Sequence, residues 1–185
     1  MTRPWRLVTD RLKSLRLFRP KPYHSTQASV KRVRDTIVKR YGTGRGDILQ
    51  YNNEVFFNKL LAESGICPMI LDNCDRERKI VFQYCGEPLS VDNAPNTWKE
   101  QLSRILDVLE GQQVYHNDCH LNNFLVHGDK IYIIDFAWSS LVRPGFPALN
   151  TLNRSKLAEA TSITEAISAY PPSPHFRHDH NTPPQ

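Results

Sequence analysis

The sequence predicts an α+β fold in which a small sheet with one helix precedes a mostly helical second half. Three observations lead to this class. Short segments rich in β-branched residues, between residues 29 and 83, surround a single helical segment. A second amphipathic helix begins near residue 98. Beyond it, an apolar hairpin is closed by the turn HGDK.

The composition sets the size of the core and the class of protein. With 185 residues, 39% of them hydrophobic, the chain can bury one core or two small lobes that share a cleft. Its cysteines form neither a C-x-x-C pair nor a dense disulfide framework, and no run approaches the ~20 apolar residues that span a bilayer. We therefore expect a soluble, cytoplasmic protein with reduced cysteines.

The amino-terminal segment, residues 1–22, is basic and amphipathic. Residues 1–41 hold 12 Lys or Arg against Asp10 and Asp35. Within WRLVTDRLKSLRLF, residues 5–18, one helical face collects Trp5, Val8, Leu12 and Leu15. Three interpretations stay open: peripheral contact of residues 1–20 with an anionic membrane, an organelle-targeting peptide, or a helix docked on its own domain. Nucleic acid is not expected as a partner, because aromatic residues are not interleaved with the charges.

The strands are predicted from alternation and β-branching. SVKRVRDTIVKRY predicts two strands joined near Arg34 and Asp35. The further predicted strands are Thr36–Tyr41 (the second of that pair), Met69–Leu71, Lys79–Gln83, Phe124–Val126 and Ile131–Ile134.

Three helices are predicted after residue 42. Asp47 is the expected N-cap of the first, with Gln50 three residues later, and Gly65 ends it. Thr97 and Glu100 form a predicted capping box for a helix from Trp98 to about Glu110. NRSKLAEATSITEAISAY predicts one more helix, and the proline-rich residues 171–185 predict a disordered tail.

Polar groups flank the predicted hairpin. Asn123 precedes its first strand and Asp135 follows its second, so pairing of the strands brings an amide oxygen and a carboxylate together. Such oxygen ligands suit Mg²⁺. Asp118, on the preceding loop, would face a substrate hydroxyl and accept its proton during attack on a γ-phosphate.

The motif HNDCHLNN followed by IIDF resembles the catalytic loop and metal-binding segment of the protein-kinase-like phosphotransferase superfamily. The resemblance implies that Asp118 is the catalytic aspartate, that Asn123 and Asp135 bind magnesium, and that His116 braces the loop. It also implies a two-lobed kinase-like domain over residues 23–170. A small β-rich lobe would cover about 23–86 and a reduced helical lobe about 87–170.

Two other segments extend the resemblance. TIVKRY resembles the strand that carries the phosphate-binding lysine, giving Lys39, and YNNEVFFNKLL resembles the following helix, giving Glu54 as the partner of that lysine. IVFQYCGEPLS resembles the strand and hinge that contact adenine, giving backbone groups of Gln83, Tyr84 and Cys85. ATP and Mg are therefore the implied cofactors.

The sequence also departs from the superfamily pattern. YHSTQASVKRVRD, which precedes the lysine strand, contains no glycine where a G-x-G-x-x-G loop would cover the phosphates. Ala137 stands where the metal-binding motif has glycine. The Ala137 change leaves the metal ligand intact, whereas the missing glycine loop keeps open the alternative of a catalytically impaired pseudokinase that acts as a binding scaffold.

The segment after Asp135 bears on the acceptor. Only 50 residues follow it and no A-P-E motif occurs, which leaves little room for a peptide-binding lobe. His120, two residues after Asp118, resembles the D-x-H pattern of kinases that act on small molecules, sugars and lipid-linked sugars. The expected function is therefore transfer of the γ-phosphoryl group of Mg-ATP to a hydroxyl of a sugar, glycolipid or other small molecule, and a serine/threonine protein kinase remains the alternative.

Overall fold

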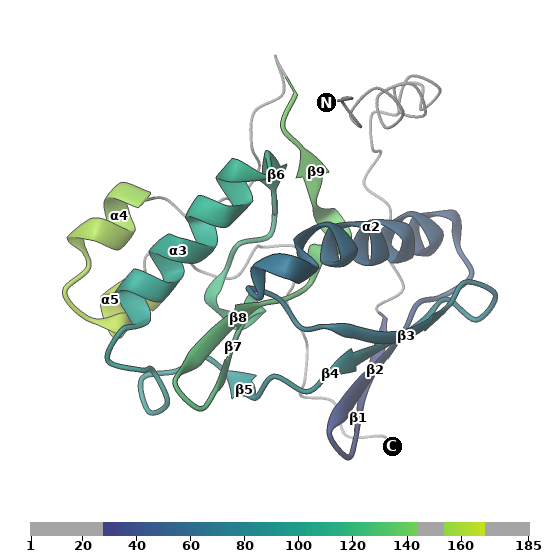
Figure 1. Ribbon diagram of the computed structural model, residues 1–185, viewed down its shortest axis with the longest axis horizontal. Helices are drawn as coiled ribbons and strands as arrows, with labels where there is room; N and C mark the ends of the chain where they lie inside the picture. The colour runs from purple at the N-terminus through teal and green to yellow at the C-terminus, as the bar shows by residue number, and fades with distance from the viewer. Residues whose placement is uncertain (1–27, 144–153, 169–185) are drawn as a thin grey trace, which may run out of the picture.

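The computed structural model describes residues 28–143 and 154–168, and within these it has the predicted α+β composition (Figure 1). The predicted amino-terminal helix, residues 5–18, and the predicted tail, residues 171–185, lie outside this part of the chain. Among the described helices, none is both long and apolar enough to cross a membrane.

The first sheet has four antiparallel strands in the order β1-β2-β4-β3. Their bounds are β1 Ser29–Val33, β2 Thr36–Arg40, β3 Ile70–Cys74 and β4 Lys79–Gln83. The β1–β2 turn lies where it was predicted, with Arg34 in the left-handed region at φ 54°. The predicted third strand was too short, because β3 continues through polar Asp72 and Asn73. Backbone pairing with β4 holds this edge strand and does not require apolar side chains.

Helix α2, Arg45–Leu61, lies along one face of this sheet (Figure 1). It begins earlier than predicted, and Asp47 is its third residue and not its N-cap. The Asp47 carboxylate accepts a hydrogen bond from the Gly44 amide at 3.0 Å, so it caps the helix from inside the first turn. After a 3₁₀ turn, η1 Ala62–Ser64, Gly65 adopts φ 66° and ends the helical segment as predicted.

The second sheet contains the predicted hairpin. Strands β7, Phe124–His127, and β8, Lys130–Ile133, pair with Phe124 opposite Ile133. A short strand that was not predicted, β5 Glu87–Pro88, adds to β7. Gly86 connects the two sheets at φ 91°, and a Cβ at this position would lie 1.7 Å from the Val126 carbonyl oxygen. Only glycine fits there.

The remaining elements are helices, 3₁₀ turns and one short strand pair. Their bounds are α3 Trp98–Gly111, β6 Val114–Tyr115, η2 Leu121–Asn123, η3 Phe136–Trp138, β9 Ser140–Leu141, α4 Arg154–Glu159 and α5 Ile163–Ser168, with β6 antiparallel to β9. The predicted capping box of α3 does not form, because the Thr97 hydroxyl accepts from the Gln101 side chain at 2.9 Å.

The single helix predicted after residue 153 is instead two short helices, α4 and α5. The Ser162 hydroxyl accepts from the Glu165 amide at 3.2 Å and caps a new helix there. The break keeps the apolar side chains on one side, and Leu157, Ala160, Ile163 and Ala166 are all buried.

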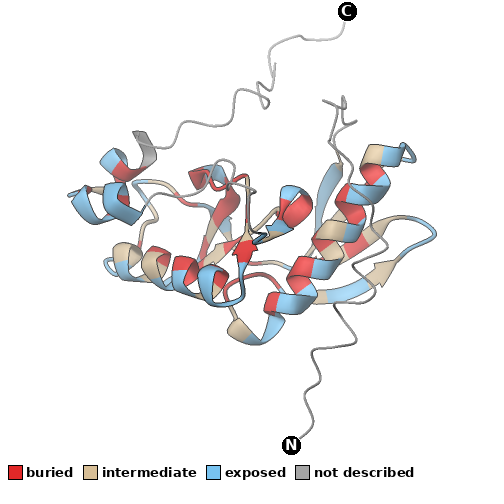
Figure 2. Cartoon of the chain, turned by 90° about the horizontal axis from the view of Figure 1, so that it is seen from above, coloured by how far each residue is buried: buried red, intermediate tan, exposed pale blue. Residues whose placement is uncertain are grey.

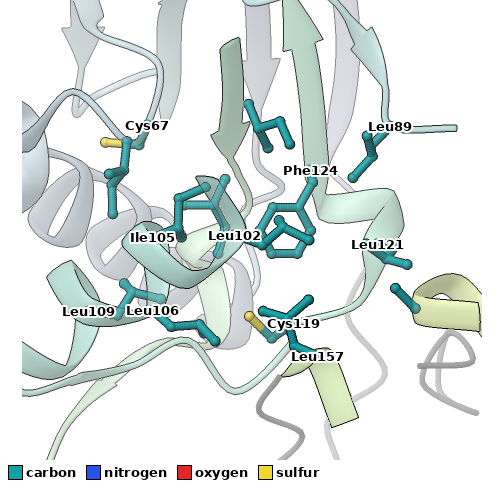
Figure 3. Close-up of a cluster of buried hydrophobic side chains, with 14 of the residues drawn as sticks. Cys67, Leu89, Leu102, Ile105, Leu106, Leu109, Cys119, Leu121, Phe124 and Leu157 are labelled. Atoms are coloured by element: carbon teal, nitrogen blue, oxygen red, sulfur yellow. The ribbon is translucent and has the colours of Figure 1, made fainter. Parts of the chain in front are cut away.

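Two clusters of buried side chains form the interior (Figure 2). The smaller cluster joins the first sheet, α2 and η3, and consists of Tyr41, Tyr51, Ile80, Phe82 and Ala137. In the larger cluster Phe124, fully buried, lies beside Leu102 of α3, and Leu157 of α4 packs near Cys119 (Figure 3). The chain segments that connect the two clusters carry the charged residues described next.

Candidate active site

Three charged side chains from distant parts of the chain meet near the end of β8. Lys39 Nζ lies 2.8 Å from Asp135 Oδ1 and 3.4 Å from Glu54 Oε2. Lys39 comes from β2, Glu54 from α2, and Asp135 follows β8 directly. The structure thus brings together three of the residues predicted for the site.

The Glu54 carboxylate is held by further hydrogen bonds. Tyr41 donates its hydroxyl to Glu54 Oε2 at 3.2 Å, and Asn58 Nδ2 donates to Glu54 Oε1 at 3.4 Å and to its backbone oxygen at 2.8 Å. The side chain of Glu54 is only 3% exposed. A buried carboxyl group with several donors is fixed in position, so α2 cannot shift without breaking this network.

The pKa values of the three side chains depend on burial and on how close Lys39 lies to each of the two carboxylates. Burial alone would lower the pKa of Lys39, but Asp135 and Glu54 raise it well above its ordinary value, so the ammonium stays charged. Burial also opposes ionisation of Asp135, yet the close ammonium holds its pKa below the usual range. Glu54 lies farther from Lys39, and there burial prevails and raises its pKa to about 7.

A second polar cluster surrounds Asp118. Asn123 Nδ2 donates to the Asp118 backbone oxygen at 2.8 Å and to its carboxylate at 3.2 Å. His120 Nε2 lies 3.5 Å from Asp118 Oδ1. All three residues are buried, so the carboxylate of Asp118 is held at a defined place in its loop.

Backbone contacts connect the two clusters. The Ile134 amide donates to the Asn123 carbonyl at 2.9 Å, which places Asp135 next to the Asp118 loop. On the other side, His116 Nε2 pairs with the Ile134 carbonyl at 2.9 Å, and its ring packs edge-on against Phe136. Burial lowers the pKa of His116, so the ring is neutral and Nε2 carries the donated proton. His116 therefore contacts both neighbours of Asp135, the carbonyl of Ile134 and the ring of Phe136, as expected of a residue predicted to brace the loop.

A cavity of about 270 Å³ opens beside the charged cluster. Lys39, Glu54 and Asp135 line it, together with Ala28, Val30, Ile37, Tyr41, Gln50, Asn58, Pro68, Phe82, Gln83, Leu125, Ile134, Ala137 and Trp138. A larger cavity of about 500 Å³ lies over another face of α2, around Phe56 and Leu60. We assign the candidate site to the smaller cavity, because the converging charged groups line that one.

The three residues whose backbone groups were predicted to contact adenine lie in different surroundings. Gln83 lines the cavity, but Cys85 is buried in the interior and Tyr84 is exposed, with its hydroxyl on Glu87. The Gln83 amide donates to the Met69 carbonyl at 2.9 Å and the Tyr84 amide to the Asp35 carbonyl at 3.1 Å. These two backbone donors are therefore used within the protein and are not offered to a ligand.

The side-chain oxygens of Asn123 and Asp135 are of the chemical type that a hard cation prefers. Because the Asn123 amide nitrogen is used by Asp118, the oxygen is the remaining polar atom of that side chain. One amide oxygen and one carboxylate are the small protein ligand set that Mg²⁺ takes when phosphates and water complete its shell. Over residues 28–143 and 154–168, no group of three or more His, Cys, Asp or Glu side chains is arranged so that it could hold a metal ion.

Several neighbours of the site were missed in the sequence. Tyr41 lies two positions after Lys39, directly past the end of β2, and Asn58 lies four positions after Glu54 on α2, so strand and helix periodicity could have identified both. Asn53 and Asn117, which contact the segment after Asp135, give no such signal. Comparison with protein-family models and with curated proteins gives no match.

Proposed function

We propose that this chain is an ATP-dependent phosphotransferase that moves the γ-phosphoryl group of Mg-ATP to a hydroxyl group. The observation that carries the proposal is the meeting of Lys39, Glu54 and Asp135 at one cavity, with Asp118 on the adjoining loop. A buried cation supported by two carboxylates is suited to bind phosphate oxygens.

Each residue then has a distinct role. Lys39 contacts the phosphates, and Glu54 keeps its ammonium in place. Asn123 and Asp135 hold the magnesium ion, which neutralises charge on the phosphates when bound. Asp118 orients the acceptor hydroxyl and accepts its proton, so that catalysis consists mainly of positioning and charge stabilisation.

The arrangement of the two buried clusters supports the finer fold proposal, a two-lobed kinase-like domain. One cluster joins the four-stranded sheet to α2, and the other joins the hairpin β7–β8 to α3, α4 and α5. The proposed nucleotide cavity draws its lining from both parts: Ile37 and Phe82 from the first sheet, Leu125 and Ile134 from the second half. Nucleotides commonly bind at such junctions.

For the acceptor, we propose a small molecule, such as a sugar or a glycolipid. His120 beside Asp118 adds a second polar side chain where a hydroxyl would enter. A serine/threonine acceptor in a protein is the alternative within the same reaction class.

Two observations favour a pseudokinase instead. The Asp135 carboxylate that would bind magnesium is already paired with Lys39 at 2.8 Å, and no glycine precedes the lysine strand to bring backbone amides to the phosphates. Such a pseudokinase would keep the shape of the site but would not catalyse phosphoryl transfer.

The test is nucleotide binding and transfer by the full-length protein. ATP with Mg²⁺ at 100 times its Kd should stabilise the wild type by about 2.7 kcal/mol in thermal unfolding, and Lys39→Met should remove this stabilisation. Lys31→Met, at an exposed lysine on β1, is the matched control and should retain it. Absence of any Mg-ATP binding by the wild type would overturn the proposal.

Transfer is measured with γ-labelled ATP against extracted metabolites, glycolipids and total protein. Label in a small molecule or glycolipid supports the proposed acceptor, whereas label in protein supports the alternative. Binding without transfer to any fraction supports the scaffold.

A further inference from the structure

Two asparagine side chains hold the segment that follows Asp135. Asn53 Nδ2 donates to the Ala137 carbonyl at 3.1 Å and to the Ser139 carbonyl at 3.4 Å. Asn117 Nδ2 donates to the Trp138 carbonyl at 3.0 Å and to the Ser140 hydroxyl at 2.9 Å. Three consecutive carbonyls, of residues 137 to 139, thus accept hydrogen bonds from two amides that belong to different parts of the chain.

The two asparagines are direct neighbours of site residues. Asn53 precedes Glu54 on α2, and Asn117 precedes Asp118 on its loop. Each amide therefore fastens the segment 137–140 to an element that carries another part of the site. At the other end of this segment, β9 pairs with β6.

The Asp135 backbone requires such support. Its φ of 66° and ψ of 63° lie in the left-handed region, which residues with a Cβ rarely adopt. Ser139 adds two contacts to this turn, its amide to the Phe136 carbonyl at 3.0 Å and its hydroxyl to the His116 carbonyl at 3.3 Å. A strained conformation persists only where its surroundings determine it from several sides.

We propose that Asn53 and Asn117 are positioning residues that lock residues 137–140 and thereby keep Asp135 in its metal-binding conformation before any ligand arrives. The inference rests on the proposed function, because the metal is the magnesium of Mg-ATP. It implies that α2, the Asp118 loop and the Asp135 turn are already held together before a ligand binds. No covalent modification of residues 137–140 is then needed to order the site.

The same hydrogen bonds from Asn53 and Asn117 fix the backbone of Trp138 at the edge of the cavity. Its side chain is 41% exposed and lines the proposed nucleotide site, while its own carbonyl and both flanking carbonyls are bound. The ring is therefore presented from a fixed backbone and not from a mobile loop.

The first test uses the full-length protein without nucleotide. Hydrogen exchange of the amides in residues 136–140 should be at least about tenfold faster in Asn53→Ala than in the wild type. Asn52→Ala is the matched control, since Asn52 is the adjacent exposed residue on α2. Asn117→Gly tests the second amide, because Asn117 has φ 64° and alanine would add strain there. Asn53→Ser keeps one donor and should give an intermediate rate.

The exchange result separates positioning from general stability. Faster exchange confined to residues 136–140, with unchanged rates in β2 and β4, supports the proposal. Unchanged rates in Asn53→Ala, or equal acceleration in every element, overturn it.

The second test is binding of ADP with and without Mg²⁺. In Asn53→Ala the Mg²⁺ concentration that gives half of the full gain in ADP affinity should rise about tenfold, while the Mg-free affinity, which Trp138 at the edge of the cavity can influence, should fall by about twofold at most. Asn53→Asp should have a larger effect, because a carboxylate would face the same carbonyls. An equal loss of Mg-free affinity would overturn the positioning role. If the wild type binds no ADP, the proposed function fails, whereas the exchange experiment still decides whether the two asparagines lock the segment.

Discussion

Lys39 Nζ lies 2.8 Å from Asp135 Oδ1, although the two residues are 96 positions apart in the chain. With Glu54 also present, one buried ammonium faces two carboxylates. Burying such charged groups is costly even though the Asp135 side chain is 30% exposed and Glu54 is partly protonated near neutral pH, and an apolar cluster of equal volume would often be as stable. Such a cluster is therefore better explained by a ligand that it binds than by the stability of the fold.

Asp118→Asn should separate transfer from binding. Loss of the proton acceptor should lower kcat by about 10³-fold, while the Kd for Mg-ATP stays within about threefold, because Asp118 does not line the nucleotide cavity. Single-turnover transfer and calorimetric binding measure the two quantities. Asp129→Asn, an exposed aspartate in the β7–β8 turn, is the control. Near-normal turnover in Asp118→Asn would refute the catalytic role.

Glu54→Gln should stabilise the fold at high pH and impair nucleotide binding. The pKa of Glu54 is raised from 4.5 to about 7, so the folded state retains a proton that the unfolded state has lost. Stability therefore falls as the pH rises through this window, by about 3 kcal/mol in total. The uncharged variant avoids this loss.

Urea unfolding at pH values from 4.5 to 8 measures the effect. The variant and the wild type should be nearly equal at pH 4.5, and the variant should be more stable at pH 8. Glu77→Gln, at an exposed position, should leave the wild-type pH dependence unchanged. A Glu54→Gln protein that is less stable than the wild type at pH 8 would contradict this account.

Gly86→Ala should destabilise the protein by about 3 kcal/mol or more, because the new Cβ would lie 1.7 Å from the Val126 carbonyl oxygen and φ is 91°. Gly111→Ala is the matched control. It lies at the end of α3 with nothing near its Cβ, so it should be neutral or gain up to about 0.5 kcal/mol. Chemical unfolding of both variants checks the prediction, and equal stabilities would exclude the close approach at Gly86.

Leu157→Ala should cost about 2–5 kcal/mol, because this leucine of α4 is 2% exposed in the larger buried cluster. Arg154→Ala removes ion pairs of 2.7 and 2.8 Å to Asp107 and Glu110, but these are exposed and should be worth less than about 1 kcal/mol. Thermal unfolding compares the two variants. A larger loss in Arg154→Ala would mean that α4 is held to α3 by charge and not by burial.

Local signals in the sequence account for much of the fold. The hairpin β7–β8 and the strands β2 and β4 were predicted nearly to their ends, because period-2 alternation and a turn residue define them locally. The errors lie where tertiary contacts compete with local preference. Asp47 caps α2 from its third position, β3 is held by its neighbour, and Ser162 divides one predicted helix into two.

By itself, the sequence determined which residue types are available for the chemistry: Lys39, Glu54, Asp118, Asn123 and Asp135, in this order along the chain. Only the tertiary structure decided that Lys39 sits closer to Asp135 than to Glu54, that backbone donors near Gln83 are used internally, and that Asn53 and Asn117 hold the turn after Asp135. The physical reason is that helix and strand periods act over a few residues, whereas these contacts depend on how sheets and helices pack across the whole chain.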